Sequence, residues 1–146
     1  SLHAELQEVT HNLVGIIRTG AELKEAIAKI AEIRKRSANV AVAGGRKFNP
    51  GFHLAFDLDN MLLVAESTAK SAISREESRG GHTRDDFPGM DSGWRQYNHI
   101  SSFDGNQVNV RKQTLPFMPK ELFDLFEVDE LKKYMTPEEI AKGGSN

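Results

Sequence analysis

Residues 54–73, LAFDLDNMLLVAESTAKSAI, are the most apolar stretch of the chain and decide its fold. Apolar side chains recur along it every three or four residues, which is the spacing of one face of an α-helix. Alanines on that face allow a neighbouring helix to approach closely. The stretch predicts a long core helix, the third in the chain. Its expected inner face comprises Leu54, Leu58, Met61, Leu62, Ala65, Ala69, Ala72 and Ile73.

Two further helices are expected on the N-terminal side of this stretch. The first is amphipathic and ends near Gly15. Its expected inner face comprises Leu2, Leu6, Val9 and Leu13. Thr19 and Glu22 form a capping-box pattern that opens the second helix, which stops before Gly44. Its expected inner face comprises Leu23, Ala26, Ile27, Ile30 and Ile33. Three such helices with short connections predict a mainly α fold, an antiparallel three-helix bundle of the spectrin-repeat kind.

The C-terminal side changes character. Residues 77–88, ESRGGHTRDDFP, are charged and have no apolar period, so they predict a loop. Strand-like residues 97–103 and 107–112 flank an Asp-Gly pair and predict a small β-hairpin. Short helices follow, one of them starting at Thr136 and Pro137. We expect one domain, with residues 1–112 forming the bundle, loop and hairpin and residues 113–146 forming an extension of it.

Composition excludes several classes of function. The 19 basic and 21 acidic residues give a net charge of −2, which argues against nucleic acid as a partner. Cysteine is absent, so the chain has no thiolate ligand and no cysteine nucleophile. No apolar run reaches the roughly 18 residues that span a bilayer, so no direct membrane insertion is expected. The chain starts at Ser1 inside a helical pattern, which we interpret as the boundary of a piece cut from a larger enzyme.

Sites for independent chemistry are weakly indicated. None of the five histidines is paired at the helical spacing of metal ligands, and nucleotide-binding and serine-hydrolase motifs are missing. A small hydrolase or metal enzyme that uses His82 and Asp85 stays open as an alternative. The basic run of residues 34–36 is expected to be a solvated face at a helix end, with an acidic partner as the second interpretation.

One cluster of charged residues stands out in the predicted loop. Arg79, His82 and Arg84 lie within six residues, beside Asp85 and Asp86. Arginine forks pair well with carboxylates and carbonyls, so the loop is either a docking surface for a second domain or a cap that pairs with its own bundle. The residues alone favour these two readings about equally.

The same residues carry a family resemblance. Residues 77–88 resemble the Glu-Ser-Arg-Gly-x-His-x-Arg-x-Asp-x-Pro signature in the C-terminal helical domain of succinate dehydrogenase and fumarate reductase flavoprotein subunits. Residues 14–18 and 60–66, Trp94 and the hairpin also resemble that domain, so the likeness covers residues 1–112. The tail from Leu115 to Ile140 is similar to that of actinobacterial-type members. L-aspartate oxidase and adenylylsulfate reductase share the same domain plan, and L-aspartate oxidase remains an alternative.

The resemblance implies a role for the chain within a larger oxidoreductase. The parent subunit would interconvert succinate and fumarate with FAD and pass electrons to an iron–sulfur subunit, in the cytoplasm and peripheral to the inner face of the cell membrane. The family's catalytic and flavin-binding residues precede this domain, so no catalytic, cofactor-binding or metal residue is expected here. Arg79, His82, Arg84 and Asp85 would anchor the domain against the flavin-binding domain. The alternative from another class is a free-standing helical module that binds a protein partner.

Overall fold

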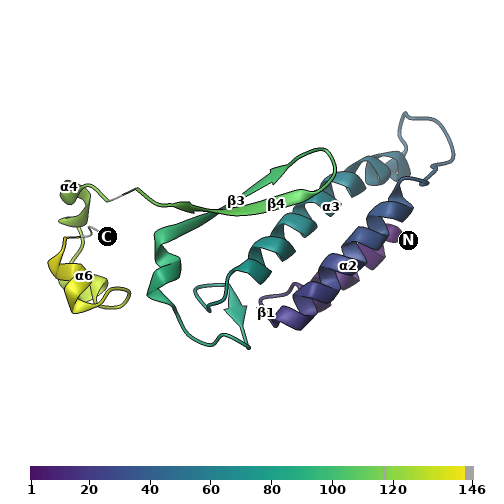
Figure 1. The fold of residues 1–146 in the computed structure, drawn as a ribbon. Helices are drawn as coiled ribbons and strands as arrows, with labels where there is room; N and C mark the ends of the chain where they lie inside the picture. Colours follow the sequence, from purple (N-terminus) through teal and green to yellow (C-terminus); the bar gives the residue numbers. More distant parts are fainter. Residues whose placement is uncertain (117, 144–146) are drawn as a thin grey trace. The chain divides into compact units, whose positions relative to one another are not determined.

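Three long helices form the first part of the chain. The computed structural model describes residues 1–116 and 118–143. The helices are α1 (Leu2–Leu13), α2 (Gly20–Ser37) and α3 (Pro50–Ser74) (Figure 1). Each begins at a side-chain cap, Ser1, Thr19 and Asn49 in turn, which accepts a hydrogen bond from a backbone N–H of the first turn. The capping box of Thr19 and Glu22 is confirmed, because each side chain accepts from the other residue's backbone N–H.

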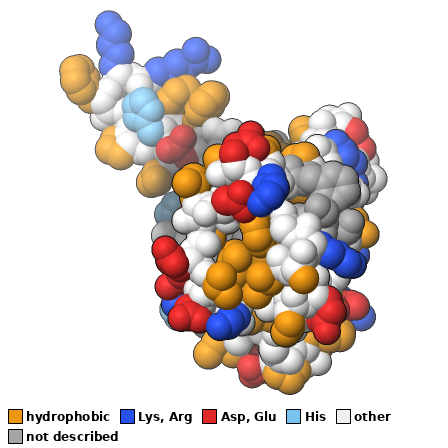
Figure 2. All heavy atoms as spheres, turned by 90° about the vertical axis from the view of Figure 1, so that its left-hand side faces the viewer, with side chains coloured by type: hydrophobic (Ala, Val, Ile, Leu, Met, Phe, Trp, Pro, Cys, Tyr) orange, Lys and Arg blue, Asp and Glu red, His pale blue; other side chains and the backbone are white. Residues whose placement is uncertain are grey.

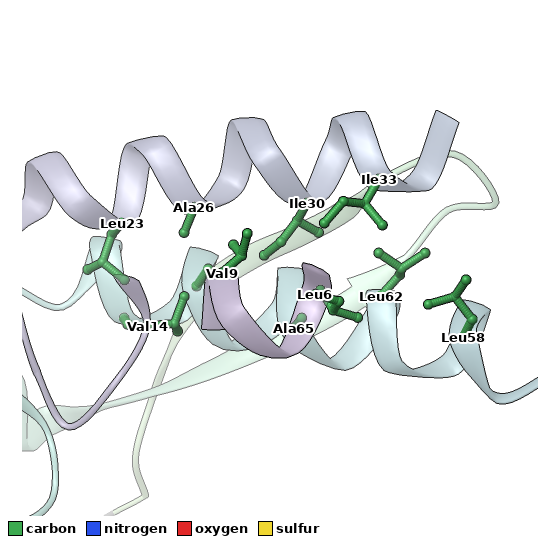
Figure 3. Close-up of a cluster of buried hydrophobic side chains, with 12 residues drawn as sticks. Leu6, Val9, Val14, Leu23, Ala26, Ile30, Ile33, Leu58, Leu62 and Ala65 are labelled. Atoms are coloured by element: carbon green, nitrogen blue, oxygen red, sulfur yellow. The ribbon is translucent and has the colours of Figure 1, made fainter. Parts of the chain in front are cut away.

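The three helices share one hydrophobic core, and Figure 3 shows their side chains pointing toward one another. Leu23 and Leu62 are fully buried, and Ala69 on α3 is too. Small residues on α3 allow the backbone of a neighbouring helix to come close. The buried cluster is Leu6, Val9, Val14, Leu23, Ala26, Ile30, Ile33, Leu58, Leu62, Ala65, Ala69 and Ala72.

The prediction was wrong for one residue of the inner face of α3. Leu54, in the first turns of α3, is 49% exposed. With 25 residues against 12, α3 is much longer than α1, so its two ends are not both covered by that helix. The buried face of α3 begins one turn later, at Leu58.

A short parallel pair joins two segments that are distant in sequence. Strand β1 (Ile17–Arg18) lies between α1 and α2, and β2 (Thr83–Arg84) follows α3. Ile17 pairs with Thr83 and Arg18 with Arg84. The connection between α1 and α2 is therefore tied to the segment that follows α3.

The predicted hairpin is confirmed as β3 (Tyr97–Phe103) and β4 (Val108–Thr114). At its turn, the Asp104 carboxylate accepts from two backbone N–H groups, and Gly105 has a φ of 95°, a conformation that favours glycine. Val108 at the start of β4 is buried against α3. Its N–H donates to the Glu66 carboxylate and its carbonyl accepts from Lys70.

The chain divides into two compact units. One comprises Ser1–Met90 with His99–Arg111, and the other comprises Asp91–Asn98 with Lys112–Asn146. The second unit contains the 3-10 helix η1 (Ser92–Gln96) and the short helices α4 (Lys120–Phe123), α5 (Val128–Leu131) and α6 (Pro137–Ala141). Within it, Arg95 donates to the Tyr134 carbonyl and to Glu139. The predicted division at residue 112 into a domain and its extension stays a prediction.

The chain is mainly α-helical with a small β-hairpin, as predicted, and the pair of β1 and β2 is a second small sheet that was not predicted. The helix start at Thr136 and Pro137 is confirmed, and it carries a second capping box with Glu139. Among the described residues, no helix combines the length and the apolar character needed to cross a membrane.

Candidate functional site

The candidate site is the segment that follows α3, residues 77–87, here called the signature loop. Its backbone is fixed at both ends. The N–H groups of Thr83 and Asp85 donate to the carbonyls of Ile16 and Arg18, at 3.2 and 3.1 Å. Arg79 and His82 exchange backbone hydrogen bonds of 2.8 and 3.0 Å. The loop is therefore an ordered structure with defined side-chain positions.

Arg84 is the buried centre of the signature loop, with 2% of the residue exposed. Its Nη1 donates to the carbonyls of Ala72, Ile73 and Arg75, at 3.1, 3.1 and 3.3 Å. These carbonyls belong to the C-terminal end of α3, where backbone acceptors lack partners within the helix and the helix dipole favours a cation. Arg84 thus caps α3 from the loop.

Asp86 binds the other side of the same guanidinium. The Nε and Nη2 atoms of Arg84 donate to its two oxygens, both at 2.8 Å. Asp86 Oδ2 also accepts from the backbone N–H of Gly20 at 2.9 Å, in the first turn of α2. The hydrogen bond from Arg84, with that of Gly20, holds the pKa of Asp86 well below its usual range. This carboxylate therefore links the start of α2 to the end of α3 through Arg84.

Glu77 forms a second buried charge cluster, with only 1% of the residue exposed. Arg75 Nη2 lies 2.6 Å from its Oε1 atom, and Arg79 Nε and Nη2 lie 3.1 Å from Oε1 and Oε2. A buried carboxylate requires such pairing, because its desolvation is otherwise costly. The predicted docking residue Arg79 is thus held inside the loop, with 22% of its side chain exposed.

His82 bridges two segments through both ring nitrogens. Nδ1 lies 2.7 Å from Nη2 of Arg18, and Nε2 lies 3.0 Å from the Arg75 carbonyl. Since Arg18 can only donate, Nδ1 accepts and Nε2 carries the proton, which defines a neutral imidazole. Burial, together with the charges of Arg18, Arg75 and Arg84, lowers the pKa of His82. The ring is therefore suited to a structural role in its neutral form.

Arg18 performs for α1 the role that Arg84 performs for α3. Its Nη1 donates to the carbonyls of Val14 and Gly15, at 3.1 and 2.7 Å, where α1 ends. Burial, and secondarily the charge of Arg84, lowers the pKa of Arg18. Two arginines from paired strands thus cap two helix ends.

The outer surface of the site is partly apolar. Asp85 is exposed, and His82 is partly exposed. Next to them across the β1 and β2 pairing, Ile16 and Ile17 are 69% and 66% exposed. We call Ile16, Ile17, Arg79, His82 and Asp85 the loop face. Apolar side chains with polar neighbours are typical of protein contact surfaces.

The structure brings the predicted residues Arg79, His82 and Arg84 together in one network, with the side chain of Asp85 outside it. All three side chains have partners within the chain: Arg79 pairs with Glu77, His82 with Arg18 and the Arg75 carbonyl, and Arg84 with Asp86 and the end of α3. Each guanidinium nitrogen of Arg84 already donates to one of these acceptors. Sequence reasoning missed Arg18 and Gly20, because a two-residue strand gives no periodic signal that would link them to the loop.

Within the described residues, no group of three or more histidine, cysteine or acidic side chains could hold a metal ion. Both ring nitrogens of His82 are engaged, by Arg18 and by the Arg75 carbonyl. The start of α2, which follows β1, has backbone N–H groups engaged by Asp86 at Gly20 and by the Thr19 capping box. A helix N-terminus after a strand is a common place for a dinucleotide pyrophosphate.

A shallow groove of about 550 Å³ runs between α1 and α3. Its walls are mostly apolar, and Val64 on its α3 side is 66% exposed. Figure 2 shows another face, the left-hand side of Figure 1 where α4 and α6 lie, and there too hydrophobic side chains lie in the open between acidic and basic ones. Apolar surface of this kind is typical of proteins that make contact with other polypeptides.

Comparison with known proteins gives consistent matches. The sequence profile of the family described as "Fumarate reductase flavoprotein C-term" matches residues 3–133. An uncharacterised FAD-dependent oxidoreductase of Methanocaldococcus jannaschii is 41% identical over 95 residues, which make up 65% of this chain and 17% of that protein. The fumarate reductase flavoprotein subunit of Haemophilus influenzae is 38% identical over 114 residues, 77% of this chain and 16% of that protein.

A solved structure covers almost the whole chain. The apo form of the Mycobacterium smegmatis Sdh1 complex contains a chain that is 51% identical, with a TM-score of 0.82. The match covers 97% of this chain and 25% of that one. The chain therefore spans a quarter of this structural relative and about one sixth of the two curated relatives.

Proposed function

The chain belongs to the fumarate reductase flavoprotein C-terminal family, and from this premise we propose that it is the non-catalytic C-terminal domain of an FAD-dependent oxidoreductase subunit. The parent subunit interconverts succinate and fumarate and passes electrons to an iron–sulfur subunit. It works on the cytoplasmic side, peripheral to the cell membrane. One observation supports the non-catalytic role most directly. The side-chain nitrogens of Arg84 and His82 in the signature loop already have hydrogen-bond partners within the chain.

The domain docks on the flavin-binding domain through the loop face. Support comes from the exposure of Ile16 and Ile17 beside the exposed carboxylate of Asp85. Arg79 and His82 form the partly exposed polar border of this surface. Arg84 is buried and contributes to this surface indirectly, because its hydrogen bonds fix the position of the backbone next to Asp85. The pre-organised loop lowers the entropy cost of association.

We also propose that the helices form an antiparallel three-helix bundle of the spectrin-repeat kind. The buried stripes on α1, α2 and α3 support this arrangement, as does the single core that they share. FAD is a cofactor of the parent subunit and is bound outside this chain. The occupied N-terminus of α2 supports that assignment.

Binding of the chain to the separately produced flavin-binding part of the subunit tests the docking proposal. Ile17→Asp places a charge in the loop face, and we expect it to weaken binding at least tenfold. Arg79→Ala should weaken it less, because Arg79 lies at the border. The control is Leu125→Asp, at an exposed apolar residue of the other unit. Equal binding by the wild-type, Ile17→Asp and Leu125→Asp chains would contradict docking through this face.

A failure of binding by every form, including the wild type, would favour a free-standing interaction module instead. The L-aspartate oxidase alternative concerns the substrate of the parent. It predicts the same docking with L-aspartate as the oxidised substrate, so an assay with both substrates separates the two.

A further inference from the structure

The connection between α2 and α3 presents an aromatic side chain to solvent. Phe48 is 101% exposed and has a φ of 54°. This is the left-handed region, which residues other than glycine, asparagine and aspartate rarely adopt. It is the only such non-glycine residue in the part of the chain that the structure describes. Local strain together with full exposure of a phenyl ring calls for an explanation outside the fold of the domain.

The conformation of this connection is fixed by contacts on both sides of Phe48. The Asn49 amide donates to the carbonyls of Ala43 and Gly45, at 3.0 and 2.9 Å. Its Oδ1 atom accepts from the N–H of Phe52 in the first turn of α3. The side chain of Val42 packs so closely on Gly51 that a Cβ there would lie 3.2 Å from it. The backbone on both sides of the exposed ring is therefore held by defined contacts.

The surroundings of Phe48 carry a strong positive charge. Residues 33–56 contain five Lys and Arg side chains and no Asp or Glu. The whole chain has a net charge of −2, so the remaining residues sum to −7. Arg34 and Arg36 have partners within the domain, Glu66 and Glu5.

Three of these cations are available for an external partner. Lys35, Arg46 and Lys47 are exposed, and within residues 1–116 and 118–143 none of them forms an ion pair. The Arg46 guanidinium lies 5.6 Å from the ring centroid of Phe52, which holds it beside the loop. We call Lys35, Arg46, Lys47 and Phe48 the basic tip. It lies at the end of α2 opposite to β1 (Figure 1).

We propose that the basic tip docks on an acidic protein surface that offers an apolar pocket to Phe48. An exposed aromatic side chain that follows two cations in the sequence has the composition of an interaction hot spot, and the opposite charge of a partner would steer the encounter. A protein surface fits better than a bilayer, because binding to anionic lipid relies on clusters of about four to eight basic residues or on an apolar helix face. The tip offers three cations and one ring on a closed loop.

Photo-crosslinking in the cells that make the protein tests this proposal. We would replace Phe48 with p-benzoylphenylalanine, irradiate, and identify the crosslinked segment by mass spectrometry. The result expected is an adduct with a protein segment of net negative charge. Reversal of the three cations, in the combined variant Lys35→Glu, Arg46→Glu and Lys47→Glu, should lower the adduct yield at least fivefold. Circular dichroism checks that the variant is folded.

The matched control places the same photoreactive residue at Leu125, which is 77% exposed in the other unit. It should give no adduct with the segment captured from position 48. An adduct with lipid, an adduct with a neutral or basic segment, or the absence of any specific adduct at position 48 would overturn the proposal. So would a yield that charge reversal leaves unchanged.

Discussion

Arg84 donates to both carboxylate oxygens of Asp86, each at 2.8 Å, and this pair lies where α2 begins and α3 ends. The guanidinium also caps the last carbonyls of α3, while the carboxylate accepts from Gly20 in the first turn of α2. Two residues that are separated by a single position in the sequence thus connect two helices. The signature loop of this family is, in this chain, a structural joint, and we propose that its outer surface makes the contact with another domain.

Loss of the Arg84 side chain should strongly destabilise the chain. Arg84→Leu keeps much of the volume but leaves Asp86 and the α3 carbonyls without their donor. The side chain of Asp86 is 36% exposed, so the main cost is that of the α3 carbonyls left without a donor, about 1–3 kcal/mol. The free energy of unfolding from urea titrations followed by circular dichroism measures it.

A matched control for that change is Arg36→Leu, which removes an ion pair with Glu5 whose two side chains are 48% and 40% exposed. Such solvent-exposed pairs contribute little to stability. If the Arg84 and Arg36 variants lose similar amounts of stability, the joint has no special role.

Gly20→Ala should destabilise the chain although alanine is the better helix former. A Cβ at this position would lie 2.9 Å from Nη2 of Arg84 and 3.0 Å from Oδ2 of Asp86. The arginine cannot easily move, because its Nη1 atom is bound to the end of α3 and its Nε atom to Asp86. We expect a loss of about 1–3 kcal/mol, the usual range for overpacking. Thermal unfolding measures it, and Gly81→Ala, where a Cβ meets no atom within 4 Å, should be close to neutral.

Much of the helical part could be predicted from sequence. The three apolar stripes, the helix starts at Thr19 and Thr136, and the hairpin at Asp104 and Gly105 each depend on residues close together in the chain. Each is confirmed apart from Leu54. For the site, the sequence predicted the location but not the side-chain partners. The partner of His82 is Arg18, 64 residues away, and no local sequence pattern indicates a contact across two-residue strands.

The stability of the chain should depend on pH through His82. Its pKa is lowered in the folded chain, by burial first and by nearby arginines second, so the unfolded chain binds more protons. The contribution of His82 is therefore fully present above the unfolded pKa of about 6.5, and it declines as pH falls below that value toward the folded pKa. The difference in unfolding free energy between wild type and His82→Gln should shrink between pH 7.5 and pH 5.

His11→Gln, at an exposed histidine on α1, serves as the control and should follow the wild-type profile. A parallel NMR titration of the His82 ring identifies the group directly. A wild-type profile that coincides with that of His82→Gln at every pH would contradict the neutral bridge between Arg18 and the Arg75 carbonyl.

Leu62 and Val64 on α3 should respond very differently to truncation. Leu62 has no exposed surface and lies in the shared core, whereas Val64, two residues on, is 66% exposed. Leu62→Ala should cost about 2–5 kcal/mol, the range for a buried leucine. Val64→Ala should change stability by about 0.5 kcal/mol or less. Chemical denaturation of both variants checks the packing, and equal losses would mean that α3 turns a different face to the core.

The central claim, that this chain completes an oxidoreductase without holding its catalytic machinery, is tested most directly by complementation. Succinate oxidation would be measured with an artificial electron acceptor for the flavin-binding part, for this chain, and for their mixture. We predict no turnover and no flavin retained by the chain alone, and activity in the mixture well above that of the flavin-binding part by itself. Turnover or stoichiometric flavin binding by this chain alone would contradict the account, and so would a mixture no more active than the flavin-binding part.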